Sequence, residues 1–336
     1  MLDHSPQSED ELPHELSELI KRKGGLFISN SANPNDAIFT ASKSRLSGHI
    51  TYTLNHLYTS KTRTIKYGLI RSGDINAFAY ASSEPNVPLD FIGVNLGALF
   101  TLLNVFFRIL SHPSNFPEVG DARLENGDGA PLPWITTNVV SADIPYVPPR
   151  CPIRARFALE LTFCALDFLF FHEISHLRHG HIEFIREKLK ANSITEAMET
   201  EDDPSASEIR QALEIDADCG ATLHSLNRAF LAFRAHNQAR DSFSELEWAI
   251  VKHAYGSNAL ATRSICFSAY ILFRIFNVGS WRIDLQPKLT HPLPPFRAYA
   301  VGATAYEIFS QRAEYEYDPD LFMFDHSRTI ESAEFA

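Results

Sequence analysis

Residues 153–189 form a long segment without proline and with a single glycine, Gly180. Little else in the chain restricts the fold as strongly. The first half of this segment is almost entirely apolar, whereas a helix on the protein surface would show an apolar stripe on one side only. A helix that is hydrophobic all round is normally buried. We therefore expect a central buried helix, around which the rest of the chain packs.

The part of the chain before this helix has a different character. Residues 1–23 are polar and acidic and predict an N-terminal arm, loosely ordered or forming a short helix. Residues 24–336 then predict a single domain. Its first part, 24–97, contains short β-branched and aromatic runs separated by Gly, Asn, Ser and Pro, which is typical of strands and turns. These predicted strands are 50–54, 64–70, 77–81 and 91–94.

The remaining parts of the domain are mostly helical in character. Residues 98–152 predict a helix followed by an irregular, proline-rich insertion. Residues 153–336 predict the central helix and a set of further helices, the last of them after a proline-rich turn at 290–295. These further helices are expected at 207–236, 242–255, 259–277 and 296–315. The predicted fold class is α+β, mainly helical.

Composition limits the function classes. The chain has 336 residues with 30 Lys and Arg against 41 Asp and Glu, a formal net charge of −11, so we expect no nucleic-acid partner. Its N-terminus is acidic where a targeting peptide would be basic, which predicts a cytoplasmic protein. The most hydrophobic stretch, 91–110, contains Asn95, Asn104 and Arg108. These residues are costly in lipid, so we predict a core helix and no membrane span. The four cysteines lie far apart and predict reduced thiols.

A metal-binding pattern follows the apolar half of the central helix. The sequence there is His172-Glu173-Ile174-Ser175-His176. Two histidines four residues apart lie on one helix face, where both imidazoles can meet one zinc ion at about 2.0 to 2.1 Å. The glutamate beside them can reach a metal-bound water. His179 lies about one turn further along the same stripe, so it is a candidate for a spare ligand or for a residue that contacts a ligand; the alternative is a packed or solvated histidine.

Zinc needs a third protein ligand. A metzincin would have Gly at position 179 and His at 182, but this sequence has His179 and Ile182 there. The other usual ligand is a glutamate on a second helix. Glu214 and Asp218 share a face of the predicted 207–236 helix, so one can bind metal while the other orients a ligand imidazole. Asp216 points elsewhere on that helix and is interpreted as a surface charge.

With these two motifs the sequence resembles the gluzincin zinc metallopeptidases, above all the family of the heat-shock protease HtpX and the CAAX prenyl proteases. Gly180-His181 after the first motif resembles the end of that family's active-site helix. Asn76-Ala77-Phe78-Ala79 resembles its substrate-edge strand. Thr290-His291-Pro292, followed by Arg297, resembles its C-terminal motif. A weaker resemblance, in size and in the first motif, is to the phage-exclusion peptidase Lit.

The resemblance implies a zincin-like fold with an active-site helix under a small sheet. It implies one Zn2+ per chain, held by His172, His176 and Glu214. It further implies that Asp218 accepts a hydrogen bond from a ligand histidine, His172, and that His181 makes a structural hydrogen bond.

It also implies the catalytic roles. Glu173 would act as general base on a zinc-activated water, and His291 or Arg297 would stabilise the oxyanion. An extended protein or peptide substrate would add as a strand beside residues 76–79, that is Asn76, Ala77, Phe78 and Ala79.

The predicted function is therefore that of a soluble, cytoplasmic zinc metalloendopeptidase. One alternative is a Lit-like phage-defence protease with a single intracellular target. Another is a regulatory protein that zinc stabilises without catalysis. Glu173 argues against this last alternative, because a structural zinc site needs no base beside an open coordination position.

Overall fold

The computed structural model describes residues 5–6, 8–28, 37–57, 63–84, 86, 88–127, 146–189, 193–195, 203–276 and 288–310. The helices are α1 (His14–Arg22), α2 (Ala37–His56), α3 (Leu96–Ser111), α4 (Pro152–Arg178), α5 (His181–Leu189), α6 (Pro204–Gln238), α7 (Glu245–Tyr255), α8 (Asn258–Phe276) and α9 (Pro294–Ser310). The strands are β1 (Thr64–Ile70), β2 (Ala77–Ala81), β3 (Leu89–Asn95) and β4 (Ser193–Thr195). Short 3-10 turns lie at Glu9–Glu11, Ala122–Leu124 and Arg240–Ser242. The fold is α+β and mainly helical, as predicted.

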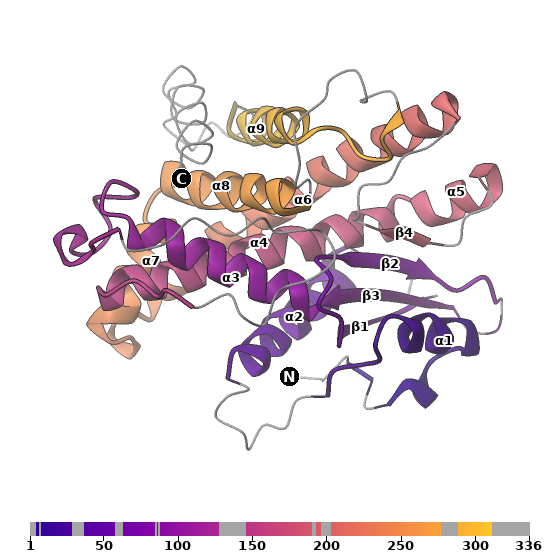
Figure 1. Ribbon diagram of the computed structural model, residues 1–336, viewed down its shortest axis with the longest axis horizontal. Coiled ribbons are helices and arrows are strands. Elements are labelled where there is room, and N and C mark those ends of the chain that lie inside the picture. The colour runs from indigo at the N-terminus through magenta and orange to yellow at the C-terminus, as the bar shows by residue number, and fades with distance from the viewer. Residues whose placement is uncertain are drawn as a thin grey trace.

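Helix α4 runs through the centre of the molecule (Figure 1). It packs against α3, α6, α7 and α8, and its last turns lie over the sheet. Nearly every side chain from Phe157 to Leu177 is buried. The helix begins with Pro152 at its first turn, where a missing N–H costs nothing. This confirms the central buried helix that the apolar run predicts.

The sheet has the strand order β1-β3-β2-β4. β1 is parallel to β3, whereas β2 is antiparallel to both β3 and β4. Successive side chains of a strand point to opposite faces. In β2 the small side chains of Ala77, Ala79 and Ala81 lie in the main core with α4, and Phe78 and Tyr80 lie in a second core with α1. Small residues on the α4 face let that helix approach the sheet closely.

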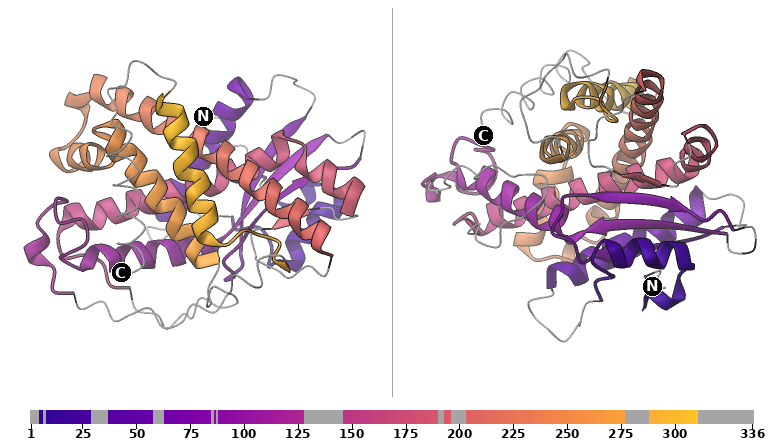
Figure 2. Two further views of the ribbon diagram at one scale, coloured as in Figure 1. Left: turned by 90° about the horizontal axis from the view of Figure 1, so that it is seen from above. Right: turned by 45° about the vertical axis from the view of Figure 1, so that its right-hand side comes forward.

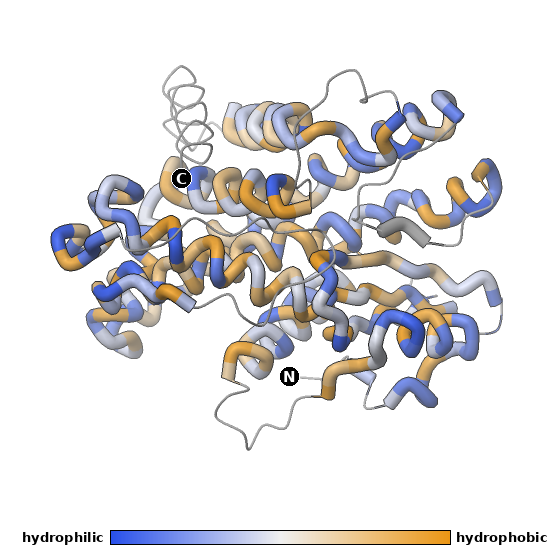
Figure 3. Tube along the Cα trace, in the orientation of Figure 1, coloured by the Kyte–Doolittle hydropathy of each residue, from blue (hydrophilic) through white to orange (hydrophobic). Residues whose placement is uncertain are grey.

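Helices therefore cover both faces of the sheet. Figure 1 and the right-hand view of Figure 2 show α1 on one face and the end of α4 on the other. The left-hand view of Figure 2 shows α9 crossing above α6 and α8. In Figure 3 the hydrophobic colour concentrates along α3, α4 and α8, and polar residues gather towards the outer ends of the helices.

Some predicted elements differ from the structure. Residues 50–54, predicted as a strand, belong to α2. Its buried residues include Phe39, Leu46, Ile50 and Thr53, a spacing of three, four and seven that fits a helix and not a strand. The β-branched residues within it gave a misleading local signal, so the 24–97 part is less strand-rich than expected.

Two further boundaries are refined. The segment 153–189 is not one helix, because Gly180, at a φ of 74°, separates α4 from α5. A left-handed residue of this kind ends many helices. The N-terminal arm forms a short helix, α1, whose Leu16 and Ile20 are fully buried against the sheet. Three predicted segments extend beyond the described residues: 128–145 of the insertion, residue 277 at the end of the 259–277 helix, and 311–315 at the end of the last helix.

Among the described residues, α8 is the helix whose length and hydropathy would allow it to cross a membrane. Its apolar window is 78% buried inside the protein, as in a core helix. The predicted core helix at 91–110 corresponds to β3 and α3, and α3 is a shorter apolar helix. All four cysteines are free, in keeping with reduced thiols.

Candidate metal centre

Helices α4 and α6 bring together the three predicted metal ligands. The Nε2 atoms of His172 and His176 lie 2.9 Å apart. The Glu214 carboxylate lies 3.2 Å from His172 Nε2 and 3.5 Å from His176 Nε2. All three side chains are at most 3% exposed. Two imidazole nitrogens and a carboxylate oxygen therefore converge on one buried point.

A close helix contact holds the two ligand-bearing helices together. Gly220 of α6 lies against Ser175 of α4, between the ligand histidines. A Cβ atom at position 220 would lie 2.3 Å from Ser175 Oγ and 3.0 Å from Ser175 Cβ. Glycine therefore allows α6 to approach α4 closely enough for Glu214 to reach the two histidines.

Asp218 lies beside His172, the histidine that the resemblance implies it orients. It lies one turn after Glu214, and its Oδ1 is 2.9 Å from Nδ1 of His172. The carboxylate thus faces Nδ1 of His172, while Nε2 of the same ring faces the shared point. Arg297 donates to both oxygens of Asp218 at 2.8 Å. The bidentate pair fixes this carboxylate in turn.

The C-terminal motif reaches the same centre from the start of α9. Nε2 of His291 lies 3.3 Å from Glu214 Oε2, and its side chain is 4% exposed. Thr290 Oγ1 lies 3.0 Å from His291 Nδ1. This contact engages Nδ1 and leaves Nε2 of the ring facing Glu214 and the centre. Arg297 is 3.7 Å from Glu214 and stacks on Phe273, with its charged group already bound to Asp218. His291 is therefore better placed than Arg297 to donate to a substrate oxygen.

Glu173 lies beside His172 on α4 and is fully buried. Two further buried carboxylates, Glu214 and Asp218, lie near one buried guanidinium, Arg297. Buried carboxylates are costly unless they are paired, and a divalent cation bound by Glu214 would pair it.

The donor set also fits a metal ion chemically. His172, His176 and Glu214 each offer one ligand atom, and these atoms lie within 4.8 Å of one another. Glu214 Oε2 accepts no hydrogen bond from the described residues, although it is buried. Neutral imidazoles and a carboxylate are donors that zinc and related transition metals take. The group can therefore hold a metal ion.

The predicted substrate strand is placed differently from expectation. Ala77, Phe78 and Ala79 are buried in β2, and Asn76 precedes it. β2 is not an edge strand, because β4 pairs with it through the registers Phe78 with Thr195 and Ala79 with Ile194. A peptide could pair with this side of β2 only if β4 were released from it. The sequence did not predict β4, whose three residues lie between the predicted central helix and the predicted 207–236 helix.

A second cluster lies next to the first and was not predicted as a unit. His179, His181 and Asp216 also offer three ligand atoms within 4.8 Å of one another. Asp216 is 54% exposed, yet its carboxylate contacts both histidines, so it is more than the isolated surface charge that was expected. His179 therefore contacts Asp216. The histidine that contacts a predicted metal ligand is instead His181, whose Nδ1 lies 2.9 Å from Nδ1 of His176. Burial lowers the pKa of His181 below its usual value.

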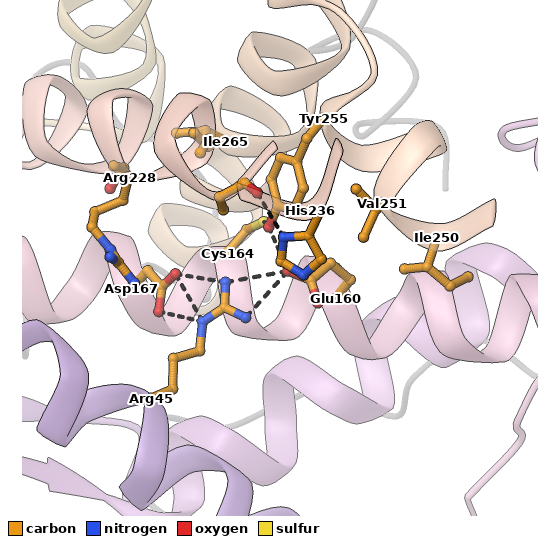
Figure 4. A pocket seen from close by; sticks show the side chains of 13 residues that line it. Arg45, Glu160, Cys164, Asp167, Arg228, His236, Ile250, Val251, Tyr255 and Ile265 are labelled. Carbon is orange, nitrogen blue, oxygen red and sulfur yellow. Dashed lines mark hydrogen bonds and ion pairs between the residues drawn. The ribbon is translucent and has the colours of Figure 1, made fainter. Parts of the chain in front are cut away.

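A partly buried ionic network lies further towards the N-terminus of α4. Figure 4 shows Arg45 of α2 between Glu160 and Asp167 of α4, in a cavity of about 210 Å³. Arg45 and His49 hold the pKa of Asp167 well below its usual range, against the opposing effect of burial. The guanidinium is already engaged by two carboxylates, so we interpret the network as a structural link between α2 and α4.

Comparisons with known proteins give no match: no family model, no curated protein and no solved structure matches the chain. The relation to the gluzincins therefore remains a prediction carried by the motifs and by the convergence of their residues.

Proposed function

We propose that this protein is a zinc-dependent metallopeptidase of the gluzincin type. One observation carries the proposal: His172, His176 and Glu214, from motifs about 40 residues apart, converge at 2.9 to 3.5 Å in a buried centre. Zinc fits this donor set, and three protein ligands leave a position for water or substrate. When bound there, zinc would polarise the scissile carbonyl and lower the pKa of a water.

The protein's own residues would carry the proton transfers. Glu173 is the neighbouring buried carboxylate, and it would take a proton from the attacking water and pass it to the leaving amine. His291 would donate a hydrogen bond from Nε2 to the oxyanion that forms on the peptide carbonyl. Asp218 and Arg297 would keep His172 in the tautomer and orientation that a metal ligand needs.

The substrate class is a protein or peptide in extended form. β2 would offer backbone hydrogen bonds to such a chain once its pairing with β4 is released. A defence protease with one target would use the same residues, so the site does not select between this role and a broader peptidase.

The proposal is tested by Glu173→Gln, with peptide cleavage and metal content measured on the same samples. A randomised peptide mixture read by mass spectrometry serves as substrate. We expect the wild-type protein to cleave peptides and the variant to keep its metal while losing at least about 100-fold in rate, the usual contribution of a positioned base. The matched control is Glu187→Gln, the same change at an exposed position of α5.

Each other outcome has a definite meaning. Cleavage by Glu173→Gln at the wild-type rate would contradict the assigned base. Metal binding without any cleavage in the wild-type protein would favour the non-catalytic, zinc-stabilised regulatory protein instead.

A further inference from the structure

The second cluster lies where α4 ends and α5 begins. His179 is the C-cap residue of α4 and His181 is the first residue of α5. The left-handed Gly180 between them turns the chain, so both imidazoles face Asp216 on α6. Asp216 Oδ2 lies 2.5 Å from His179 Nδ1 and 3.1 Å from His181 Nε2. Three donor atoms thus meet at a point outside the first centre.

Exposure distinguishes this cluster from the first one. The side chains of Asp216 and His179 are 54% and 31% exposed, whereas that of His181 is 7% exposed. An ion can therefore enter from solvent without any movement of the helices. In a tetrahedral site, donor atoms at about 2.0 to 2.2 Å from the metal lie about 3.3 to 3.6 Å from one another. Asp216 Oδ2 must move about 1 Å from His179 Nδ1, and less from His181 Nε2, to reach that spacing.

His181 also connects the two clusters. Its Nδ1 lies 2.9 Å from Nδ1 of His176, while its Nε2 faces Asp216. Two ring nitrogens that face each other at this distance share one hydrogen. When His176 Nε2 binds a metal, the hydrogen of His176 is on Nδ1 and points at His181. The hydrogen of His181 is then on Nε2, where it blocks a metal ligand bond and points at Asp216.

The reverse also holds. A metal on His181 Nε2 leaves the hydrogen of His181 on Nδ1, pointing at His176. His176 must then carry its own hydrogen on Nε2, the atom that faces Glu214 and the first centre. Each metal thus favours the tautomers that disfavour the other.

We propose that His179, His181 and Asp216 bind a second divalent transition-metal ion, more weakly than the first centre, and that its binding weakens binding at the first. The ion is of the class that takes imidazole and carboxylate donors, such as Zn2+, Co2+ or Ni2+. The lower affinity follows from the exposed carboxylate and from its competing contact with water. The inference rests on the proposed function, because the first centre must be a metal site for the coupling to operate. A peptidase built in this way would be inhibited by excess zinc.

The first test is metal stoichiometry by equilibrium dialysis and mass spectrometry at rising Zn2+ concentration. We expect the wild-type protein to bind one ion and then a second, and Asp216→Asn and His179→Ala to stop at one. Glu187→Gln, which removes an exposed charge outside the cluster, should still bind two. A wild-type protein that stops at one ion, or variants that still take up a second, would overturn the proposal.

The second test measures the coupling. The first centre is loaded with isotopically labelled zinc, and release of the label is followed after natural zinc is added. In the wild-type protein the release rate should rise at least about tenfold with zinc concentration, and in Asp216→Asn it should stay constant. A release rate that is independent of zinc concentration in both proteins would refute the coupling.

The outcomes separate this inference from the proposed function. One ion that depends on His176, with no second ion, leaves the peptidase proposal intact and overturns this inference alone. A single ion that depends on Asp216 and not on His176 would support the exposed site but overturn both the coupling and the peptidase proposal. Absence of any bound ion would overturn both.

Discussion

The contact between Gly220 and Ser175 predicts a specific effect of Gly220→Ala. The new methyl group would begin 2.3 Å from Ser175 Oγ and 3.0 Å from Ser175 Cβ, where ordinary contacts are 3.4 to 4 Å. The hydroxyl can rotate away, but it then gives up its hydrogen bond to the Phe171 carbonyl. The Cβ atoms remain at least 0.4 Å too close after that rotation. Helix α6 must therefore move away from α4.

The magnitude follows from opposing terms. Alanine in place of a mid-helix glycine gains about 0.5 to 1 kcal/mol in helix propensity. The lost hydrogen bond costs about 1 kcal/mol, and overpacking costs about 1 to 3 kcal/mol. We expect a net loss of about 2 kcal/mol in the free energy of unfolding. Metal affinity should fall as well, because ligand distances at a metal tolerate changes of only about 0.2 Å.

The assays are denaturant unfolding of the metal-free protein and zinc titration of the same samples. Gly48→Ala is the matched control, since this glycine also lies inside a helix and a Cβ there meets nothing within 4 Å. The control should be stabilised by up to about 1 kcal/mol with unchanged zinc affinity. Equal stabilisation of both variants would refute the close-approach argument.

Four further predictions address other contacts. Asp218→Asn should lower zinc affinity about 10- to 100-fold in a competition titration, because His172 loses the carboxylate that orients it. His291→Ala should keep its zinc and lose about 100-fold in kcat, as removal of an oxyanion donor does. Arg45→Met should cost about 3 kcal/mol in urea unfolding, since two carboxylates of α4 lose their cation. Burial lowers the pKa of His224 from 6.5 to about 4. Between pH 6.5 and pH 4 the imidazole is therefore protonated in the unfolded chain but neutral in the folded protein. The free energy of unfolding should drop over that range by up to about 3 kcal/mol more in the wild-type protein than in His224→Gln.

The sequence predicts the centre of this fold well because the relevant signals are local and strong. The apolar run before His172 predicts α4, and acidic residues among apolar ones at Glu214 and Asp218 predict a functional face on α6. Helix α7 begins three residues later than the predicted 242, where Ser244 forms a capping box with Glu247.

Long-range contacts explain most of the differences. Nothing near Ile50 shows that α4 would cover one face of α2, so the β-branched residues alone predicted a strand. Nothing in residues 193–195 shows that they would reach β2. The contact of Asp216 with His179 and His181 depends on the turn at Gly180, whose direction the sequence does not reveal.

The measurement that tests the central claim most directly is the zinc content of the protein purified without added metal, compared with His176→Ala. We predict about one zinc ion per chain in the wild-type protein and almost none in the variant, because the variant loses one of three ligands. A wild-type protein that contains no zinc and takes none up from solution would contradict the metal centre and the function proposed from it.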